Sequence, residues 1–329
     1  MYGYGKRELG INTEYYNLYL TLKEMVSEVR LFDYMTRLQE VGRESMNRDL
    51  AETVDEFVPD FVLFSLYTDQ FMPEVLDTIK QQTLTAYYAY DDMWRKEFVD
   101  MWAPHFTYVI TSHIKGEQNL HSNGHSNGIY LSFGINHKVY VRRDLPKKYD
   151  VSFIGGWHPH RAWLISWIEK SGIKVDAWGQ KWKNGPLAQE EMVDVINQSR
   201  INLNLQNETS WDIRYLISSP RAIRNTLKSK KQFAPVNLRT FEINGCGGFQ
   251  LLPYMEGLEK RYDIGSEVEL FYTPEQLVER VHYYLKHEDE REAIAQRGYA
   301  RTSRDHRMED RFTDLFDRIL PNWHKQIFD

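Results

Sequence analysis

The chain has 329 residues, a length that suits two domains better than one. Its hydrophobic content of 42% is enough for ordinary cores and excludes a disordered protein. The net charge of -6 excludes a globally basic nucleic-acid binder, while the aromatic content of 14% fits either well-filled cores or sugar- and base-binding clefts.

Cysteine content and hydropathy limit the cellular setting. Cys246 is the one cysteine, so an intrachain disulfide and a cysteine-based zinc site are excluded, and a reducing compartment fits. The N-terminus has no apolar core of a signal peptide, and no apolar run reaches the roughly 18 residues that a membrane span needs. We therefore expect a cytoplasmic protein without a transmembrane segment.

In the first half of the chain, predicted strands alternate with predicted helices. Apolar residues recur at helical spacing over residues 14–27, and the polar segment 36–56 also predicts a helix. Pro73 stands at a plausible first helical position, which predicts a helix over 73–81. Strands are expected at 29–34, 61–67, 84–90, 106–112 and 128–134.

The alternation resumes after residues 141–150, a charged segment with a proline that predicts a linker. Strands are expected at 151–156, 173–179, 200–205 and 249–252, and helices at 161–172, at 188–199, from 237, and at 274–286, 288–300 and 308–320. This pattern is typical of parallel sheets covered by helices on both faces, so we predict an α/β fold of two Rossmann-like domains.

Two such domains predict a cleft between them, with ligands at the carboxyl ends of the strands. The beginning of the chain departs from this scheme. A doubly wound domain normally opens with a buried strand followed by a glycine turn, whereas here Gly3 and Gly5 come first. Either the usual opening strand is absent, or the first sheet is completed differently.

The segment 237–253 carries the strongest functional pattern. Asn237 is a reasonable N-cap for a helix whose start would attract a phosphate. Arg239 in the first turn would add a phosphate contact, and Glu242 would accept the hydroxyls of a ribose. The alternative, at about even odds, is an ordinary i,i+3 ion pair. The glycines that follow favour the functional interpretation because they let the backbone approach closely.

A run of basic residues precedes this segment. Seven cations and no acidic residue lie between Arg214 and Phe241, namely Arg214, Arg221, Arg224, Lys228, Lys230, Lys231 and Arg239. The run suits an anionic ligand such as a nucleotide diphosphate, a phosphorylated acceptor or nucleic acid. For the lysines a solvated loop is the better interpretation, whereas Arg214 and Arg239 are better candidates for binding.

The loop GGWHPHR (155–161) joins a predicted strand to a helix. Gly155 and Gly156 would allow close approach of a ligand, and Arg161 lies at the start of the helix. His158 would donate to a phosphate or a sugar, although a capping role fits it slightly better. A metal site here is disfavoured because no third ligand is suggested.

Asp91 and Asp92 follow a buried strand of the first half. A carboxylate there would serve as the general base for an acceptor hydroxyl, or equally as a helix N-cap. Serine-nucleophile, Walker and complete GxGxxG motifs are absent, which argues against hydrolases, P-loop NTPases and nicotinamide-dependent enzymes.

Four runs in the second half, and their continuation, carry a family resemblance. They are YDVSFIGG with Arg161, KVDAWGQKW (174–182), SRINLNL (199–205), NLRTFEINGCGGFQLL (237–252), and then 265–312 with His306 and Arg311. The chain resembles the spore-maturation-protein-B-like (CgeB-like) branch of the group 1 glycosyltransferases. In the first half the similarity is weaker, at YAYDD (88–92) and YLSFGIN (130–136).

The resemblance implies a GT-B fold. The domains would be an acceptor domain over 1–143, a donor domain over 144–305, and a last segment, 306–329, that packs back toward the first. It also implies that Glu242 binds the donor ribose, that Arg239 and the helix start bind the diphosphate, and that Trp178 and Gly179 lie near the base. Pro235 replaces the first glutamate of the pair found in many retaining relatives, so retention and inversion both stay open.

The expected function is therefore a metal-independent, hexosyltransferase-type transfer from a nucleotide-diphosphate sugar, with uridine diphosphate as the expected nucleotide, to an acceptor hydroxyl. No cofactor beyond this co-substrate is expected. The acceptor is left open among glycans, proteins, small molecules and nucleic acid. The alternatives are a non-catalytic nucleotide- or sugar-binding protein of the same fold, and a nucleic-acid-modifying glycosyltransferase.

Overall fold

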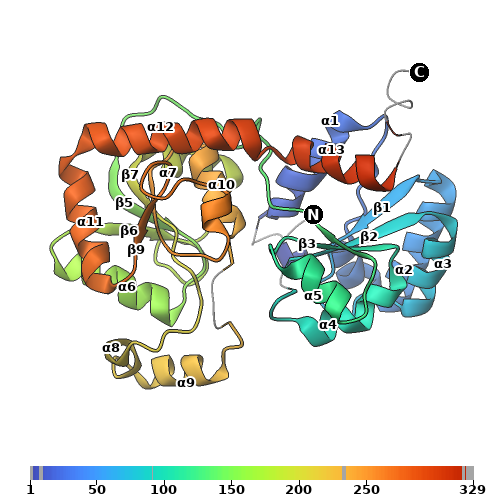
Figure 1. The fold of residues 1–329 in the computed structure, drawn as a ribbon. Coiled ribbons are helices and arrows are strands. Elements are labelled where there is room, and N and C mark those ends of the chain that lie inside the picture. The colour runs from blue at the N-terminus through green and yellow to red at the C-terminus, as the bar shows by residue number, and fades with distance from the viewer. Residues whose placement is uncertain (1–2, 7–9, 91, 232–234, 321–322, 324–329) are drawn as a thin grey trace. The chain divides into compact units, whose positions relative to one another are not determined.

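The computed structural model describes residues 3–6, 10–90, 92–231, 235–320 and 323. By its internal contacts the chain divides into two units, Met1–Phe133 with Arg311–Asp329, and Gly134–Asp310. Each unit contains one parallel sheet flanked by helices (Figure 1). The predicted α/β class with two Rossmann-like domains is thereby confirmed, while the cleft between them stays a prediction.

The first unit contains a four-stranded sheet in the order β1-β2-β3-β4. Its strands are β1 (Phe61–Phe64), β2 (Leu84–Ala89), β3 (Tyr108–Thr111) and β4 (Gly128–Tyr130). Its helices are η3 (Tyr15–Tyr19), α1 (Leu20–Met25), α2 (Tyr34–Phe57), α3 (Pro73–Gln82), α4 (Lys96–Trp102) and α5 (Gly116–Ser122), with short 3-10 turns at η1 (Gly3–Gly5) and η4 (Ala103–His105). A strand follows a helix at each step, so neighbouring strands are parallel and in chain order.

The strand expected at residues 29–34 is wrong. Residues 30–33 have no regular structure, and α2 begins at Tyr34 because the carboxylate of Asp33 accepts hydrogen bonds from the amide and hydroxyl of Thr36. Among the described residues no strand precedes β1, which pairs with β2 at the edge of the sheet. In the described residues, helices and no strand precede β1.

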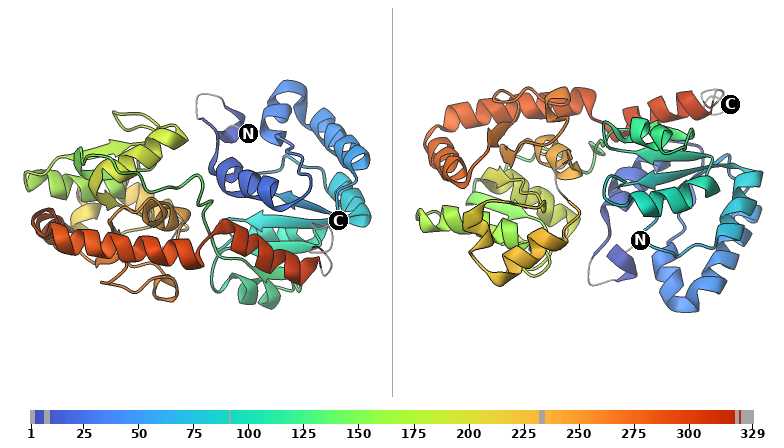
Figure 2. Two further views of the ribbon diagram at one scale, coloured as in Figure 1. Left: turned by 90° about the horizontal axis from the view of Figure 1, so that it is seen from above. Right: turned by 60° about the horizontal axis from the view of Figure 1, so that its bottom comes forward.

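The core of the first unit lies between its sheet and its helices. Phe64, Phe71 and Phe106 form aromatic contacts there, with ring centroids 5.5 Å and 5.2 Å from that of Phe64. The last part of α13 (Met308–Ile319), red in Figure 2, returns to this sheet. Its Phe316 ring meets Phe61 on β1 at 5.8 Å between centroids.

The second unit contains a five-stranded parallel sheet in the order β6-β5-β7-β8-β9. Its strands are β5 (Tyr149–Ile154), β6 (Val175–Trp178), β7 (Ser199–Leu203), β8 (Gln250–Pro253) and β9 (Glu269–Phe271). Its helices are α6 (Pro159–Lys170), α7 (Gln189–Gln198), α8 (Ile213–Leu216), α9 (Pro220–Lys228), α10 (Leu238–Gly245), α11 (Pro274–Lys286) and α12 (Glu288–Asp305), with a 3-10 turn at η5 (Leu258–Lys260). β9, α8 and α9 are additions to the predicted elements.

The central strands of the second sheet are apolar, as parallel strands covered on both faces should be. Val151, Ile201 and Leu251 are fully buried on β5, β7 and β8, and α6 and α11 supply the rest of this core. No helix within the described part of the chain is long and apolar enough to cross a membrane.

Candidate functional site

The topology of the second unit marks a place for a ligand. From β5, the second strand in the sheet, the chain goes to β6 on one side and then to β7 on the other. In doubly wound sheets of this order, ligands bind outside the carboxyl ends of the two strands where the direction reverses. Here residues 155–158 follow β5 and residues 204–210 follow β7. We call these two segments the switch-point loops.

The predicted glycines hold the first switch-point loop against the end of β6. The amide of Gly155 donates to the carbonyl of Trp178 at 2.9 Å, and a Cβ on Gly179 would lie 2.2 Å from the carbonyl oxygen of Gly155. Gly179 also has φ +131, which other residues rarely adopt. Trp178 is buried, with its ring edge-on to Tyr149. By contrast, a Cβ on Gly156 would meet no atom within 4 Å.

Arg161 joins the two switch-point loops. Its Nε donates to the carbonyl of Leu205 at 2.9 Å, and its NH1 donates to the carbonyl of Gly156 at 2.8 Å. Burial lowers the pKa of this guanidinium to about 10, so it keeps its charge at neutral pH. The prediction that Arg161 lies at the helix start beside the glycines is confirmed in geometry, and a cation stands between the two loops.

His158 takes the capping role. It precedes Pro159 as the N-cap of α6, and its Nδ1 accepts from the amide of His160 at 3.4 Å. Burial and then the charge of Arg161 lower the pKa of His158 to about 4. Its imidazole is therefore neutral at pH 7, which suits a hydrogen-bond partner better than a counter-ion for a phosphate.

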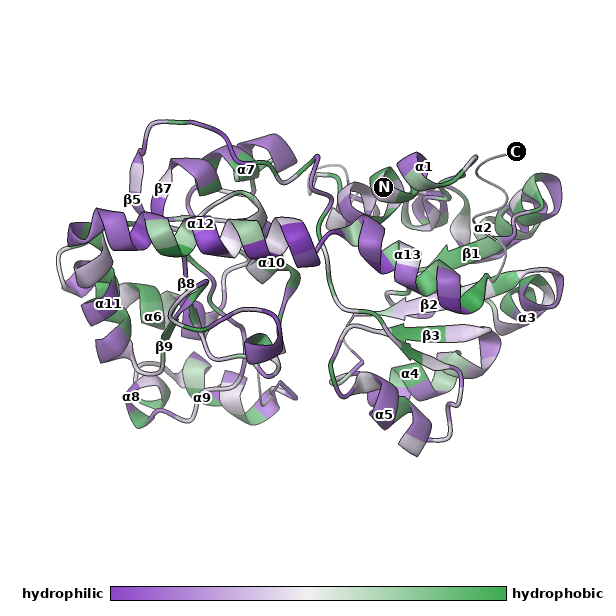
Figure 3. Cartoon of the chain, turned by 45° about the horizontal axis from the view of Figure 1, so that its top comes forward, coloured by the Kyte–Doolittle hydropathy of each residue, from purple (hydrophilic) through white to green (hydrophobic). Residues whose placement is uncertain are grey.

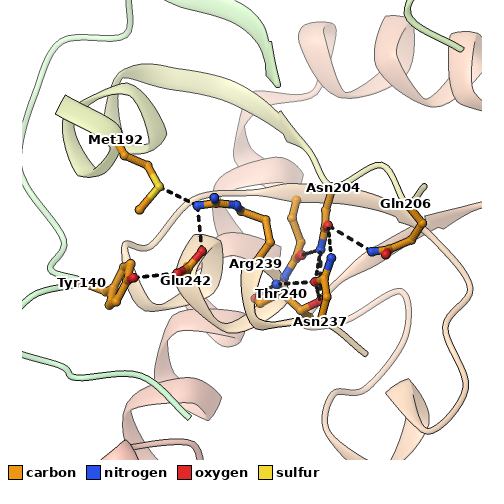
Figure 4. A network of polar contacts seen from close by, with 9 residues as sticks. Tyr140, Met192, Asn204, Gln206, Asn237, Arg239, Thr240 and Glu242 are labelled. Atoms are coloured by element: carbon orange, nitrogen blue, oxygen red, sulfur yellow. Dashed lines mark hydrogen bonds and ion pairs between the residues drawn. The ribbon is translucent and has the colours of Figure 1, made fainter. Parts of the chain in front are cut away.

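The start of α10 is fixed by a polar network (Figure 4). The Asn237 side-chain oxygen accepts from the amide of Thr240 at 3.1 Å and from its hydroxyl at 2.9 Å, which confirms the predicted N-cap. Asn237 Nδ2 donates to Asn204 Oδ1 at 3.1 Å. Asn204 follows β7, so this network holds the amino end of α10 beside the second switch-point loop.

Three residues of the second switch-point loop were missed by the sequence reasoning. Asn204 and Gln206 are both buried and hydrogen-bonded to each other. Glu208 is half-buried, and burial raises its pKa to about 7. The signal was the alternation of Asn202, Asn204 and Gln206 with apolar residues at the end of β7 and just beyond it, because an extended chain places alternate side chains on one face.

Arg239 and Glu242 contact each other. Arg239 NH1 lies 2.7 Å from Glu242 Oε2, and Tyr140 donates its hydroxyl to Glu242 Oε1 at 2.6 Å (Figure 4). The Glu242 side chain is only 3% exposed while that of Arg239 is 24% exposed, so this is a half-buried pair and not the solvated surface pair of the alternative interpretation. Burial beside this carboxylate raises the pKa of Tyr140. The separate phosphate and ribose roles stay predictions.

Arg214 lies apart from these groups. It is on α8, paired with Asp212 at 2.6 Å and with Glu275 at the start of α11, and its guanidinium stands over the Trp167 ring on α6. These partners belong to helices and not to the switch-point loops, and the structure does not bring Arg214 together with Arg161.

In the first unit, Asp92 follows β2 and Asp91 lies outside the described residues. Thr111 on β3 donates its hydroxyl to Asp92 Oδ2 at 2.6 Å. Burial raises the pKa of the Asp92 carboxyl, and the Thr111 hydrogen bond opposes that shift. Asp92 also lines a cavity of about 260 Å³ with Lys96 and Asn119. Within the ranges that the structure describes, no group of three or more His, Cys, Asp or Glu has the arrangement of a metal site.

A comparison with known families matches the part of the chain that contains Arg161, the second switch-point loop and α10. The model of a family described as glycosyl transferase-like matches residues 160–317. No curated protein matches the chain.

Solved structures match over most of the chain at low identity. HepE of Anabaena, in complex with UDP and glucose, has 11% identity and a TM-score of 0.59, with 84% of this chain and 81% of that one covered. Sucrose-phosphate synthase of Thermosynechococcus elongatus has 11% identity and a TM-score of 0.59 over 87% and 80%. The pneumococcal O-GlcNAc transferase GtfA, in complex with UDP and GlcNAc, has 11% identity and a TM-score of 0.55 over 88% and 61%. The chain thus has the GT-B glycosyltransferase fold, and its residues 160–317 are similar to the glycosyl transferase-like family.

Proposed function

We propose that the protein transfers a sugar from a nucleotide-diphosphate sugar to an acceptor hydroxyl, and that the nucleotide is uridine diphosphate. One observation carries the proposal: the glycosyl transferase-like match covers α6, the second switch-point loop and α10, which adjoin one another at the switch point. Structures of the same fold with UDP and a sugar support the choice of donor. The assignment to the CgeB-like branch and to the hexosyltransferase type belongs to this proposal.

The donor diphosphate binds at the start of α10. The first amides of a helix have no partner within it, and the helix dipole adds partial positive charge there. The side-chain oxygen of Asn237 accepts from the amide of Thr240. The amides of Leu238 and Arg239, which precede it in the first turn, point out of the helix end. Arg161 supplies a full positive charge between the switch-point loops.

These fixed donors stabilise the negative charge that develops on the departing diphosphate, a role that needs no metal ion. Because Arg161 and Asn237 are held by backbone and side-chain hydrogen bonds, they do not have to reorganise during the reaction. In the first unit, the raised pKa of Asp92 suits a general base that takes the proton from an acceptor hydroxyl.

Gly156→Val tests the site. A Cβ at Gly156 meets no atom within 4 Å and its φ is not positive, so the fold accepts the change while the isopropyl group enters the space beside the first switch-point loop. We expect calorimetric binding of UDP to weaken at least about tenfold, as for a ligand that loses about 1.4 kcal/mol. Ala300→Val, at an exposed position of α12, is the matched control.

Activity separates the enzyme from a binding protein. With UDP-glucose and UDP-GlcNAc as donors, slow release of UDP without an acceptor is expected from the wild type and not from Gly156→Val. UDP binding that is equal in both proteins would place the nucleotide elsewhere. Binding without any release of UDP, whichever acceptor is added, would favour the non-catalytic alternative.

A further inference from the structure

α8 and α9 expose an unusual amount of aliphatic surface. Ile213, Ile217 and Leu227 are 70%, 76% and 71% exposed, and Trp211 is 68% exposed. Such side chains are normally buried, and several together mark an interaction site. Figure 1 shows α8 and α9 side by side at one end of the second unit, and Figure 3 shows hydrophobic and hydrophilic residues mixed on both.

The exposure follows from how the two helices are anchored. On α8, Tyr215 is fully buried, with its ring 5.1 Å from His160 and 5.5 Å from Trp163. Ile213 and Ile217 lie on either side of it in sequence and are therefore turned outward. The packing of Tyr215 against His160 and Trp163 thus fixes α8 with these two isoleucine side chains in solvent.

α9 repeats the arrangement. Ser219 caps it by accepting from the amide of Ala222, and Ala222 and Thr226 are buried against the unit. Ile223 and Leu227, one position further along the helix, share the next side, and both are exposed. The small residues of α9 face the protein and the large apolar ones face solvent, which is the reverse of an ordinary surface helix.

Cations lie beside the exposed Ile223 and Leu227 of α9. Arg224 and Lys228 each follow an exposed apolar residue by one position, so they lie about 100° further round α9, and both are exposed. No acidic residue occurs between Arg214 and Phe241, although the chain as a whole has a net charge of -6. Asp212, between Trp211 and Ile213, is paired with Arg214, and the charged residues of α9 itself are all cations.

Aliphatic side chains in the centre, cations at the margin and a tryptophan beside them are the composition of a surface that enters the headgroup region of an anionic membrane. Nucleic acid would use the cations and leave Ile213, Ile217 and Leu227 in water, because phosphates offer them no apolar contact. We propose that the surface formed by Trp211, Ile213, Ile217, Ile223, Leu227, Arg224 and Lys228, here the α8–α9 surface, docks on the anionic face of a lipid bilayer.

The docking is peripheral, because α9 has nine residues and cannot span a bilayer. The proposal concerns where the protein works and does not rest on the proposed sugar transfer. Its consequence is that the second unit is held beside a membrane, with access to substrates that reside there.

Sedimentation of the full chain with vesicles tests the proposal. Vesicles of phosphatidylcholine mixed with phosphatidylglycerol should bind the protein, and phosphatidylcholine alone should bind it much less. Arg224→Glu with Lys228→Glu should lower the partition coefficient at least about 25-fold, taking about fivefold for each cation removed. Ile217→Ser with Leu227→Ser should lower it at least about tenfold. All four positions are exposed, so thermal stability should change little.

Val58→Ser with Met101→Ser is the matched control, because these exposed apolar residues lie in the first unit. This pair should leave binding unchanged. The proposal is overturned if the wild type does not sediment with the anionic vesicles, or if the α8–α9 variants bind as well as the wild type. It is also overturned if lipid-free ultracentrifugation shows a dimer that Ile217→Ser with Leu227→Ser dissociates, since a second copy would then cover this surface.

Discussion

Asn237 allows the charge at the start of α10 to be changed with little change in shape. In Asn237→Asp one carboxylate oxygen still accepts from the amide and hydroxyl of Thr240. The lost donor is the Nδ2 that reaches Asn204 at 3.1 Å. Losing that hydrogen bond costs about 1 kcal/mol, and the new charge at the helix start returns about 0.3 to 1 kcal/mol. Stability should therefore stay close to that of the wild type.

The effect on binding should be much larger. For an assumed separation of about 6.5 Å, the repulsion between the new unit charge and a diphosphate of charge about -2 is about 1.3 kcal/mol at the dielectric constant of water, and about 5 kcal/mol at an effective value of about 20. The smaller figure already weakens UDP binding about tenfold. A change in charge without a change in fold thus tests where the diphosphate lies.

Calorimetry with UDP and a thermal melt of the same protein samples provide the measurement. His287→Asp is the control, because it adds the same charge at the exposed N-cap of α12. α11 runs back along the sheet from β9, so α12 starts at the edge opposite the switch-point loops. If Asn237→Asp melts within about 4 °C of the wild type and binds UDP equally well, the diphosphate does not lie at α10.

Two further predictions concern buried groups. Burial is the main cause that lowers the pKa of His160 to about 4. As the pH falls, the unfolded chain therefore binds a proton at this residue before the folded protein does. The stability that His160 contributes is present above about pH 6.5 and is lost as the pH falls toward 4. His160→Phe keeps a ring against Trp163. Between pH 7 and pH 5, its free energy of unfolding should fall by about 2 kcal/mol less than that of the wild type, as measured by urea titration. An equal fall in both proteins would contradict the role of the buried His160 imidazole. Cys246 is fully buried and burial raises its thiol pKa, so it should react with Ellman's reagent only after unfolding, and rapid reaction of the native protein would refute this.

Elements with local signals could be predicted from the sequence. α11 has the predicted bounds because Thr273 caps it, Pro274 begins it and the apolar spacing is regular. The capping role of Asn237 was predictable for the same reason. The strand expected at 29–34 failed because Asp33 caps α2, which takes Tyr34 into a helix, and the residues before the cap pair with no strand.

The partners of the site residues could not be predicted, because they come from distant parts of the chain. Glu242 is buried by Tyr140, which is 102 residues earlier, and Asn204 reaches Asn237 across 33 residues. Spacing within a helix indicates which neighbours a residue can have, but not which side of the helix the fold will cover. The inverted burial of α9 is another example, since its apolar residues alone would have predicted a buried face.

The first unit is made from two segments of the chain that are separated by the whole second unit, and this has a consequence for synthesis. Phe312, Leu315 and Phe316 on α13 are buried in that unit, yet they are synthesised after the whole of residues 134–310. Domains usually fold in the order in which they are made. Here residues 134–310 are all available before the first unit has its final helix. The second unit can therefore finish folding first, while in the first unit the side of β1 that carries Phe61 stays uncovered until α13 has been synthesised.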